Sequence, residues 1–215
     1  TDGDVRMMQL AANGKIAAYY GRLAGKADFQ GIFAVVSDPV DPLCKEVLVS
    51  SGLRPGQIKG YGLGVMNKRA EYFARLYTES GDTKFADYLT EGRAFGPHGQ
   101  DLVIANSIDN YDDEVSRELT QLTVDANIKV RELGFKPYFA PAISSGAISL
   151  LLTLSSQWNY SSVYIGKGYE GAFLGIKNRI AQDTVEIEDL PLPEKLYCRI
   201  EKAYNNLCGI KPQNA

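Results

Sequence analysis

Val35-Val36-Ser37-Asp38-Pro39-Val40-Asp41 is the stretch that decides the fold. It begins inside a continuous apolar run, Gly31 to Ser37, which has a helical pattern on each side and therefore predicts a buried strand of a parallel sheet. Asp38-Pro39 ends that strand, and Asp41-Pro42 then opens a helix. A second short strand is expected at Ile58 to Gly62. The order helix, strand, helix, strand is typical of a parallel α/β sheet.

Helical and strand patterns also cover the rest of the chain. A first helix is expected from Val5 to about Leu23, behind acidic residues that suit a helix N-terminus. The longest helix is expected from Asp112 to about Leu133, with Gly134 as its C-terminal cap. The other expected elements are strands at Gly81–Glu91 and Leu102–Ser107, a buried helix at Ala142–Gln157, strands at Val163–Gly166, Ala172–Ile176 and Thr184–Ile187, and a last helix at Pro193–Cys208.

Composition excludes several classes of protein. With 45% hydrophobic and 23% charged residues, the chain is an ordinary globular protein. A net charge of −3 with scattered Lys and Arg predicts neither a nucleic-acid nor a membrane partner. The three cysteines, Cys44, Cys198 and Cys208, form no CxxC pair. Such usage indicates reduced thiols, so we expect a cytoplasmic location.

Gly96-Pro97-His98-Gly99 holds the only histidine of the 215 residues. Glycine on both sides predicts a tight turn, and imidazole has an unperturbed pKa near neutrality, which suits proton transfer. Taken alone, such a histidine more often only satisfies a hydrogen bond, and Arg6 or Arg69 taken alone is more often a solvated surface residue. The order of these three residues with Val35–Asp41 along the chain favours a catalytic role.

This order resembles the lactate/malate dehydrogenase family, over essentially all 215 residues. Val35–Asp41 is similar to the VVSNPVD of that family and Gly96–Gly99 to its GEHG. Met66-Asn67-Lys68-Arg69 is similar to its DxxR, on the helix that follows a glycine turn, here Gly60-Tyr61-Gly62. The long helix, a three-strand meander and the terminal helix are similar too.

The resemblance implies an α/β fold in two parts. Residues 1–64 would be the C-terminal part of a dinucleotide-binding domain, a remnant of a Rossmann-type parallel sheet. Residues 65–215 would form an α+β lactate/malate dehydrogenase-like catalytic domain that binds the substrate. A cis peptide bond before Pro39 is also expected, as in the motif that Val35–Asp41 resembles.

The implied activity is hydride transfer between NAD and a small 2-hydroxy acid or 2-keto acid, lactate- or malate-like. His98 matches the acid/base, and Arg69 matches the arginine that holds the substrate carboxylate through two parallel hydrogen bonds. Arg6 matches a catalytic arginine on a mobile loop, which stabilises charge on the reacting oxygen when the loop closes. Asp38 is expected at the substrate, and Val36 and Asp38 at the cofactor.

Three residues depart from the family pattern. Met66 stands where the family has the aspartate that orients the histidine and stabilises its imidazolium. Methionine can do neither, and Asn67 could at best orient the ring. Asp38 replaces an asparagine and Pro97 a glutamate. If the missing carboxylate limits the rate, Met66→Asp should raise activity, whereas indifference to this change would mean that the proton is handled in another way.

The family's first βαβ unit and its glycine-rich pyrophosphate turn have no counterpart in this sequence. No GxGxxG occurs, and only two of about six strands of a dinucleotide-binding sheet are expected. A two-strand remnant would leave an edge and both faces exposed. We therefore expect a preceding portion, and a complete protein that is roughly a third longer.

Two other functions compete with the dehydrogenase. A non-catalytic or repurposed relative, acting in binding or assembly, is favoured by Met66. An NAD-using glycosidase of the same superfamily is disfavoured, because no Cys and His are placed to bind its metal, and no metal site is predicted. The expected partners are a small 2-hydroxy acid or 2-keto acid and further copies of the chain in a homo-oligomer, a dimer or tetramer.

Overall fold

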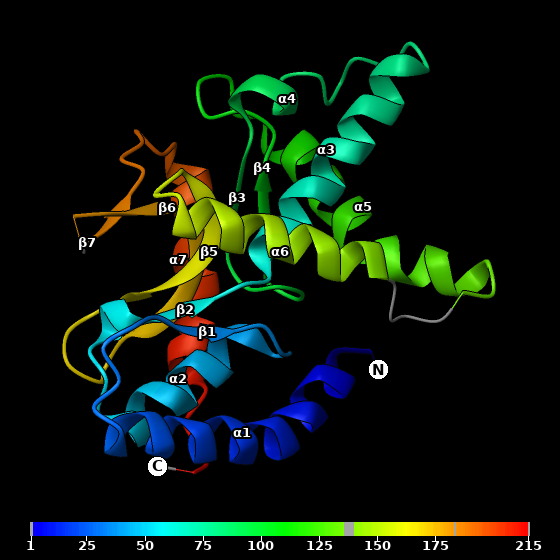
Figure 1. The fold of residues 1–215 in the computed structure, drawn as a ribbon. Coiled ribbons are helices and arrows are strands. Elements are labelled where there is room, and N and C mark those ends of the chain that lie inside the picture. The colour runs from blue at the N-terminus through cyan, green and yellow to red at the C-terminus, as the bar shows by residue number, and fades with distance from the viewer. Residues whose placement is uncertain (1, 136–139, 183, 215) are drawn as a thin grey trace.

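The first part of the chain follows the expected order of helix, strand, helix and strand. The computed structural model (Figure 1) describes residues 2–135, 140–182 and 184–214, with side chains from 9 to 135, 146 to 182 and 184 to 214. The elements are α1 (Asp2–Lys26), β1 (Phe33–Val35), α2 (Val40–Ser51), the short 3-10 helix η1 (Pro55–Gln57) and β2 (Ile58–Gly60). β1 and β2 are parallel, with Val35 opposite Gly60. Apolar side chains of α1 and α2 form one core with these strands.

The second part of the chain adds helices and antiparallel strands. They are α3 (Leu63–Glu79), α4 (Tyr88–Glu91), β3 (Arg93–Phe95), β4 (Val103–Ala105), α5 (Asp113–Glu132), α6 (Ala140–Leu154), β5 (Asn159–Ile165), β6 (Ala172–Ala181), β7 (Thr184–Ile187) and α7 (Glu194–Gly209). The main sheet has the order β1-β2-β5-β6-β7, and β3 pairs with β4 in a separate ribbon. β2 meets β5 antiparallel at Gly60 and Ser162. One sheet thus contains strands from both sides of residue 64, and the two-domain division stays a prediction.

Local signals in the sequence account for the start and end of α5. The carboxylate of Asp112 accepts hydrogen bonds from the backbone N–H groups of Glu114 (2.9 Å) and Val115 (3.0 Å). This is the N-cap arrangement that satisfies the first free amides of a helix. Gly134 follows the helix with a φ of +83°, the left-handed conformation expected of a C-terminal glycine.

The strand predicted at Gly81–Glu91 is wrong. This segment forms turns and the short helix α4, and the strand that pairs with β4 is β3. Phe85 and Tyr88 are both buried, and their spacing of three residues places them on one side of a helical turn. The backbone N–H of Lys84 bonds to the Asp82 side chain, which starts the turns.

Two predictions of burial are also wrong. β1 lies at the edge of the main sheet, and Ala34 in its middle is exposed. The helix α6 exposes Ile148, Leu151 and Leu154, the last at 77%. Between residues 146 and 154, the buried side chains of α6 are the small, polar Ser149 and Thr153, and Ser149 packs against Gly64 of α3 at a distance that leaves no room for a Cβ. An uncharged helix therefore does not have to be a buried one.

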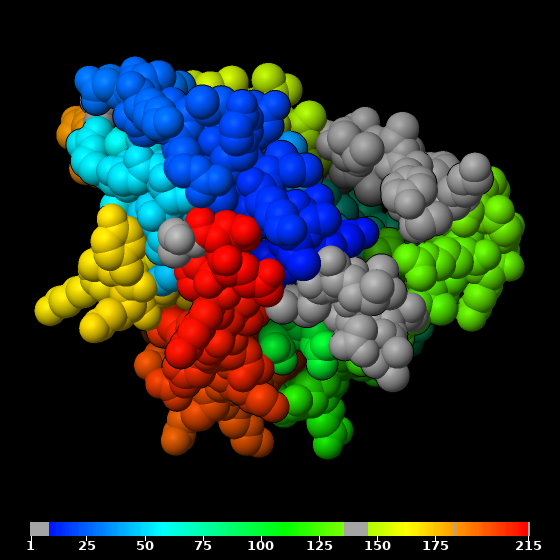
Figure 2. Space-filling view, turned by 90° about the horizontal axis from the view of Figure 1, so that it is seen from below, coloured from blue at the N-terminus to red at the C-terminus, as the bar shows by residue number. Residues whose placement is uncertain are grey.

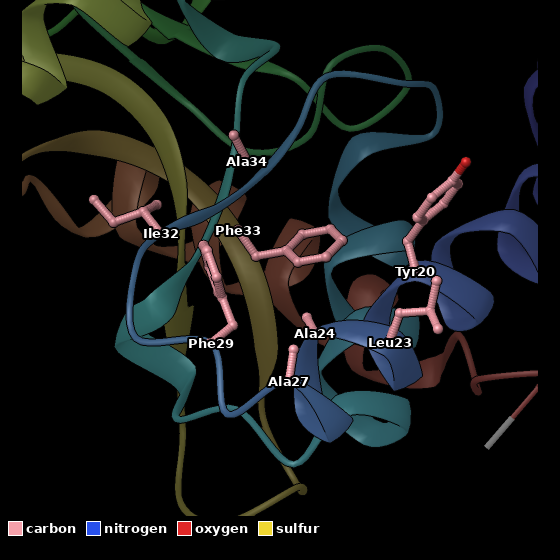
Figure 3. A pocket seen from close by; sticks show the side chains of 8 residues that line it. All are labelled: Tyr20, Leu23, Ala24, Ala27, Phe29, Ile32, Phe33 and Ala34. Atoms are coloured by element: carbon pink, nitrogen blue, oxygen red, sulfur yellow. The ribbon is translucent and has the colours of Figure 1, made fainter.

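An open apolar groove of about 480 Å³ lies between α1 and β1. Figure 3 shows its lining side chains, with Phe33 extending from β1 toward Ala24 of α1. Figure 2 shows the C-terminal segment lying beside α1, where the Glu46 carboxylate of α2 accepts the backbone N–H of Asn214 at 3.2 Å.

Among the described residues, no helix is long and apolar enough to cross a membrane.

Gly175 of β6 allows the turn after β3 to contact the main sheet. Its carbonyl accepts the backbone N–H of Gly96 at 2.9 Å, and a Cβ on Gly175 would clash with the carbonyl oxygen of Gly96 and lie 2.9 Å from Leu63. We expect Gly175→Ala to lower the free energy of unfolding by roughly 1–3 kcal/mol, because the added methyl group is overpacked against backbone. Urea unfolding measures this loss.

The matched control is Gly56→Ala, since a Cβ at Gly56 would meet nothing within 4 Å. That variant should be as stable as the unmodified protein or slightly more stable. Equal stability of the Gly175 and Gly56 variants would contradict the close contact.

Candidate functional site

The segment that follows β1 turns sharply into α2. The peptide bond between Asp38 and Pro39 is cis, so this prediction is confirmed. The side chain of Asn13 on α1 donates a hydrogen bond to the carbonyl of Asp38 at 2.7 Å. The Pro39 carbonyl in turn accepts the N–H of Leu43 in the first turn of α2 (3.1 Å). The segment is thus attached both to α1 and to α2.

A cavity of about 1150 Å³ adjoins this segment. Five parts of the chain line it: Gln9 of α1, residues 38–42, the turn at 97–103, one side of α5, and one side of α7 with Ile210 just after it. Asp38 and His98 are both lining residues, so the structure brings these two predicted site residues together. Val36 does not line the cavity; it lies at the end of β1 and is 64% exposed. Arg6 belongs to α1, and its side chain lies outside the described residues.

The ring of His98 is oriented by the backbone at the start of α3. Its Nδ1 lies 2.9 Å from the carbonyl oxygen of Gly62. A carbonyl oxygen only accepts hydrogen bonds, so Nδ1 carries the proton in this contact. A neutral ring protonated on Nδ1 has its lone pair on Nε2. That arrangement suits a ring that takes a proton at Nε2.

Arg69 lies beside the cavity and is not among the residues that line it. Its Nη2 donates to Oδ1 of Asn127 at 2.7 Å, and Asn127 is a lining residue on α5. Its Nη1 lies 3.6 Å from Sδ of Met66, which is fully buried. The guanidinium therefore reaches the wall of the same cavity that His98 lines, with Asn127 between it and the open space.

Asn67 was the residue that the sequence offered for orienting the His98 ring, but its side chain contacts other residues. Its Oδ1 accepts a hydrogen bond from the Tyr88 hydroxyl (2.8 Å), and its Nδ2 donates to Glu71 (2.7 Å). These bonds use both ends of the amide within the core of α3 and α4. Asn67 thus supports this core, and the orienting contact that the structure gives His98 comes from Gly62.

Asp41 is a site residue to which the sequence analysis assigned no role. It lines the cavity and is only 3% exposed, and its Oδ1 is buried with no hydrogen-bond partner. Burial raises the pKa of Asp41 to about 7, although the Ser162 hydroxyl and the backbone N–H of His98 favour its ionised form, and the charge of nearby Asp38 raises the pKa further. The signal in the sequence is a single carboxylate among the apolar residues of the first turn of α2.

Two further titratable groups lie in the interior, Cys44 near Asp41 and Lys59 near Cys44. Burial, together with the charge of Asp41, raises the pKa of the Cys44 thiol well above its usual value. Lys59 of β2 is fully buried and donates a hydrogen bond to Asn178, and burial lowers its pKa to about 8. Titratable groups that are buried without a strong partner lower the stability of the folded state. Such groups cluster at functional sites.

The fold is that of malate dehydrogenases. The chain is similar to the malate dehydrogenase of Aeropyrum pernix with a TM-score of 0.75 and 18% identity, over 94% of this chain and 68% of that one. The enzyme of Cryptosporidium parvum has a TM-score of 0.70 and 16% identity, over 95% and 70%. That of Archaeoglobus fulgidus, solved in complex with NADH, has a TM-score of 0.68 and 17% identity, over 91% and 65%.

The chain thus spans about two thirds of the length of these structures. No protein-family model matches it, and no curated protein matches it in sequence. At these identities the similarity shows a shared α/β architecture, with a short parallel pair followed by a mixed sheet. The roles of His98, Arg69, Asp38, Val36 and Arg6 stay predictions.

The raised pKa of Asp41 predicts a pH-dependent stability. The folded pKa of about 7 exceeds the ordinary value of 3.8, so the folded state binds this proton more tightly. Its stabilising effect is complete below pH 4 and is lost as the pH rises to about 7. We expect Asp41→Asn, which stays neutral, to match the unmodified protein near pH 4. At pH 8 it should be more stable, by an amount on the order of a few kcal/mol.

Urea unfolding at pH 4, 6 and 8 measures this difference, with Asp109→Asn on the exposed surface as the control. The Asp109 variant should track the unmodified protein at every pH. A stability difference for Asp41→Asn that does not change with pH would contradict the raised pKa.

Proposed function

We propose that the chain carries the substrate site of an NAD-dependent oxidoreductase that interconverts a small 2-hydroxy acid and its 2-keto acid, lactate- or malate-like. The observation that supports this most is the His98 ring at a cavity wall, with Nδ1 held by a backbone carbonyl. The malate dehydrogenase fold supports it independently. The substrate would lie in the cavity between His98 and the α5 wall.

His98 would exchange the proton of the reaction. In the oxidation direction, Nε2 accepts the proton of the substrate hydroxyl while the hydrogen on C2 leaves with its electron pair, and the C2–O bond becomes a carbonyl. The products are a 2-keto acid, an imidazolium and the reduced cofactor. In the reverse direction the imidazolium returns the proton to the oxygen. General acid–base catalysis of this kind contributes about 10²–10⁴-fold to a rate.

Arg69 would bind the substrate carboxylate. Its guanidinium is fixed by Asn127 on one side and touches Met66 on the other. A planar guanidinium that is held in this way loses little freedom when a carboxylate binds to it. Asn127 would have to move, or share its hydrogen bond, when the carboxylate arrives. Arg6 would stabilise charge on the reacting oxygen, as the resemblance implies.

NAD would be the hydride acceptor. The residues of this chain suit only part of the NAD molecule. The exposed Val36 and the cavity-lining Asp38, at the end of β1, are where the nicotinamide end would lie. The sequence has no glycine-rich turn for the pyrophosphate. We therefore propose that the rest of the cofactor is held by a portion of the protein beyond this chain, next to the exposed edge of β1.

The second candidate is a non-catalytic or repurposed relative of the family that acts in binding or assembly. One observation favours it. Met66 is fully buried at the position of the expected aspartate and provides no charge to an imidazolium. The exposed apolar side chains of α6, among them Leu151 and Leu154, suit an assembly role and also suit the proposed homo-oligomer. Such a protein would bind neither NADH nor a keto acid. Calorimetric titration with NADH separates it from the enzyme.

The role of His98 predicts a large loss of activity on substitution. Using NADH oxidation by pyruvate or oxaloacetate as the assay, His98→Asn should lower kcat by about 10²–10⁴-fold with little change in NADH affinity. Asparagine keeps a hydrogen-bonding group of similar size and cannot exchange the proton. Full activity in this variant would refute the proposed role.

The role of Arg69 predicts a change in KM. Arg69→Lys keeps the charge and loses the two parallel hydrogen bonds, so the KM for the keto acid should rise roughly tenfold or more. Arg75→Lys is the matched control, because Arg75 lies on the same helix and is exposed. Equal KM values for the two variants would show that Arg69 does not meet the substrate.

A further inference from the structure

We propose that the backbone carbonyl of Gly62 is the positioning group of His98, in place of the carboxylate that Met66 replaces. It holds the ring as the Nδ1–H tautomer and leaves the lone pair on Nε2. The catalytic meaning of this contact rests on the proposed function, whereas the tautomer is a property of the protein that can be measured without activity.

The direction of the Gly62 carbonyl is fixed by the start of α3. Gly62 is the N-cap residue of that helix, and its carbonyl also accepts the backbone N–H of Val65 at 3.1 Å. A carbonyl oxygen has two lone pairs and can accept both bonds. Because the first turn of α3 holds this carbonyl, it cannot rotate away from the 2.9 Å contact with Nδ1. The carbonyl is therefore a rigid acceptor for His98.

The turn that carries His98 is fixed as well. The Gly96 N–H donates to the Gly175 carbonyl (2.9 Å), and the Gly99 N–H donates to the Pro97 carbonyl (2.9 Å). The ring is thus held between a fixed turn and a fixed helix start. Its contact with Gly62 does not depend on a flexible side chain.

Position 62 has to be glycine for this contact to form. A Cβ there would lie 2.9 Å from Cβ of His98 and 3.1 Å from Cγ2 of Val40. The first of these distances is shorter than real Cβ atoms show, so either the His98 turn or α3 would have to move. The absence of a side chain at Gly62 is what allows its carbonyl to reach the ring.

Position 66 has a different partner. Sδ of Met66 lies 3.6 Å from Nη1 of Arg69, so this side chain reaches the guanidinium. Methionine brings no carboxylate to this place, so the positioning contact that the structure gives His98 is the backbone carbonyl of Gly62.

Nitrogen NMR of the full chain tests the tautomer directly, because His98 is the only histidine and gives a single set of ring signals. In spectra that correlate the ring nitrogens with the ring carbon-bound protons, at a pH where the ring is neutral, we expect a protonated Nδ1 and an unprotonated Nε2. An Nε2–H tautomer, or the exchanging mixture of a free imidazole, would overturn the proposal.

Two variants extend the test. Gly62→Ala should lose the preference for the Nδ1–H tautomer, and Gly146→Ala should keep it, since a Cβ at Gly146 meets nothing within 4 Å. A Gly62→Ala protein that keeps the preference would overturn the role of this contact. If that variant does not fold, the spectrum of the unmodified protein still decides. An Nδ1–H tautomer, together with a complete protein that lacks dehydrogenase activity, would support this proposal and remove the proposed function.

Discussion

The close approach of three backbone segments, permitted by glycines that carry no side chain between them, is the constraint on which this structure depends. Gly60 ends β2 where a Cβ would lie 2.5 Å from Val40 of α2. Gly62 allows the His98 turn to meet the start of α3, and Gly175 allows the same turn to hydrogen-bond to β6. The segment after β1, the end of β2 and the His98 turn are thereby brought to one side of the molecule. The cavity and its candidate acid/base follow from this packing.

The same packing buries groups that prefer water. Asp41 has an unpartnered Oδ1 and a pKa of about 7, and the fully buried Lys59 depends on Asn178 of β6 as its hydrogen-bond partner. Each of these groups lowers the stability of the fold at some pH. A sheet that needed only to be stable would have apolar residues here. Asp41 lines the cavity that His98 also lines, which is consistent with a functional interior.

The sequence allowed much of the fold to be predicted and less of the site. The parallel pair, the long helix α5 and the last helix follow from apolar spacing and caps such as Asp112, which are local signals. The exposed side of α6 could not be predicted, because burial depends on which elements pack against a segment. The contact of His98 with Gly62 was missed for a related reason. A backbone carbonyl leaves no trace in the residue type, and the only signal was a glycine at position 62.

Proton uptake on ligand binding tests most directly whether His98 is the acid/base of a keto-acid site. The experiment titrates the NADH-bound protein with oxamate, an unreactive amide of the same shape as a small 2-keto acid. It is run by calorimetry at pH 8 in two buffers of different ionisation enthalpy. Since His98 must be protonated to donate to the ligand oxygen and an ordinary imidazole is neutral at this pH, we predict uptake of about one proton per bound oxamate. Binding without proton uptake, or no binding at all, would contradict the account.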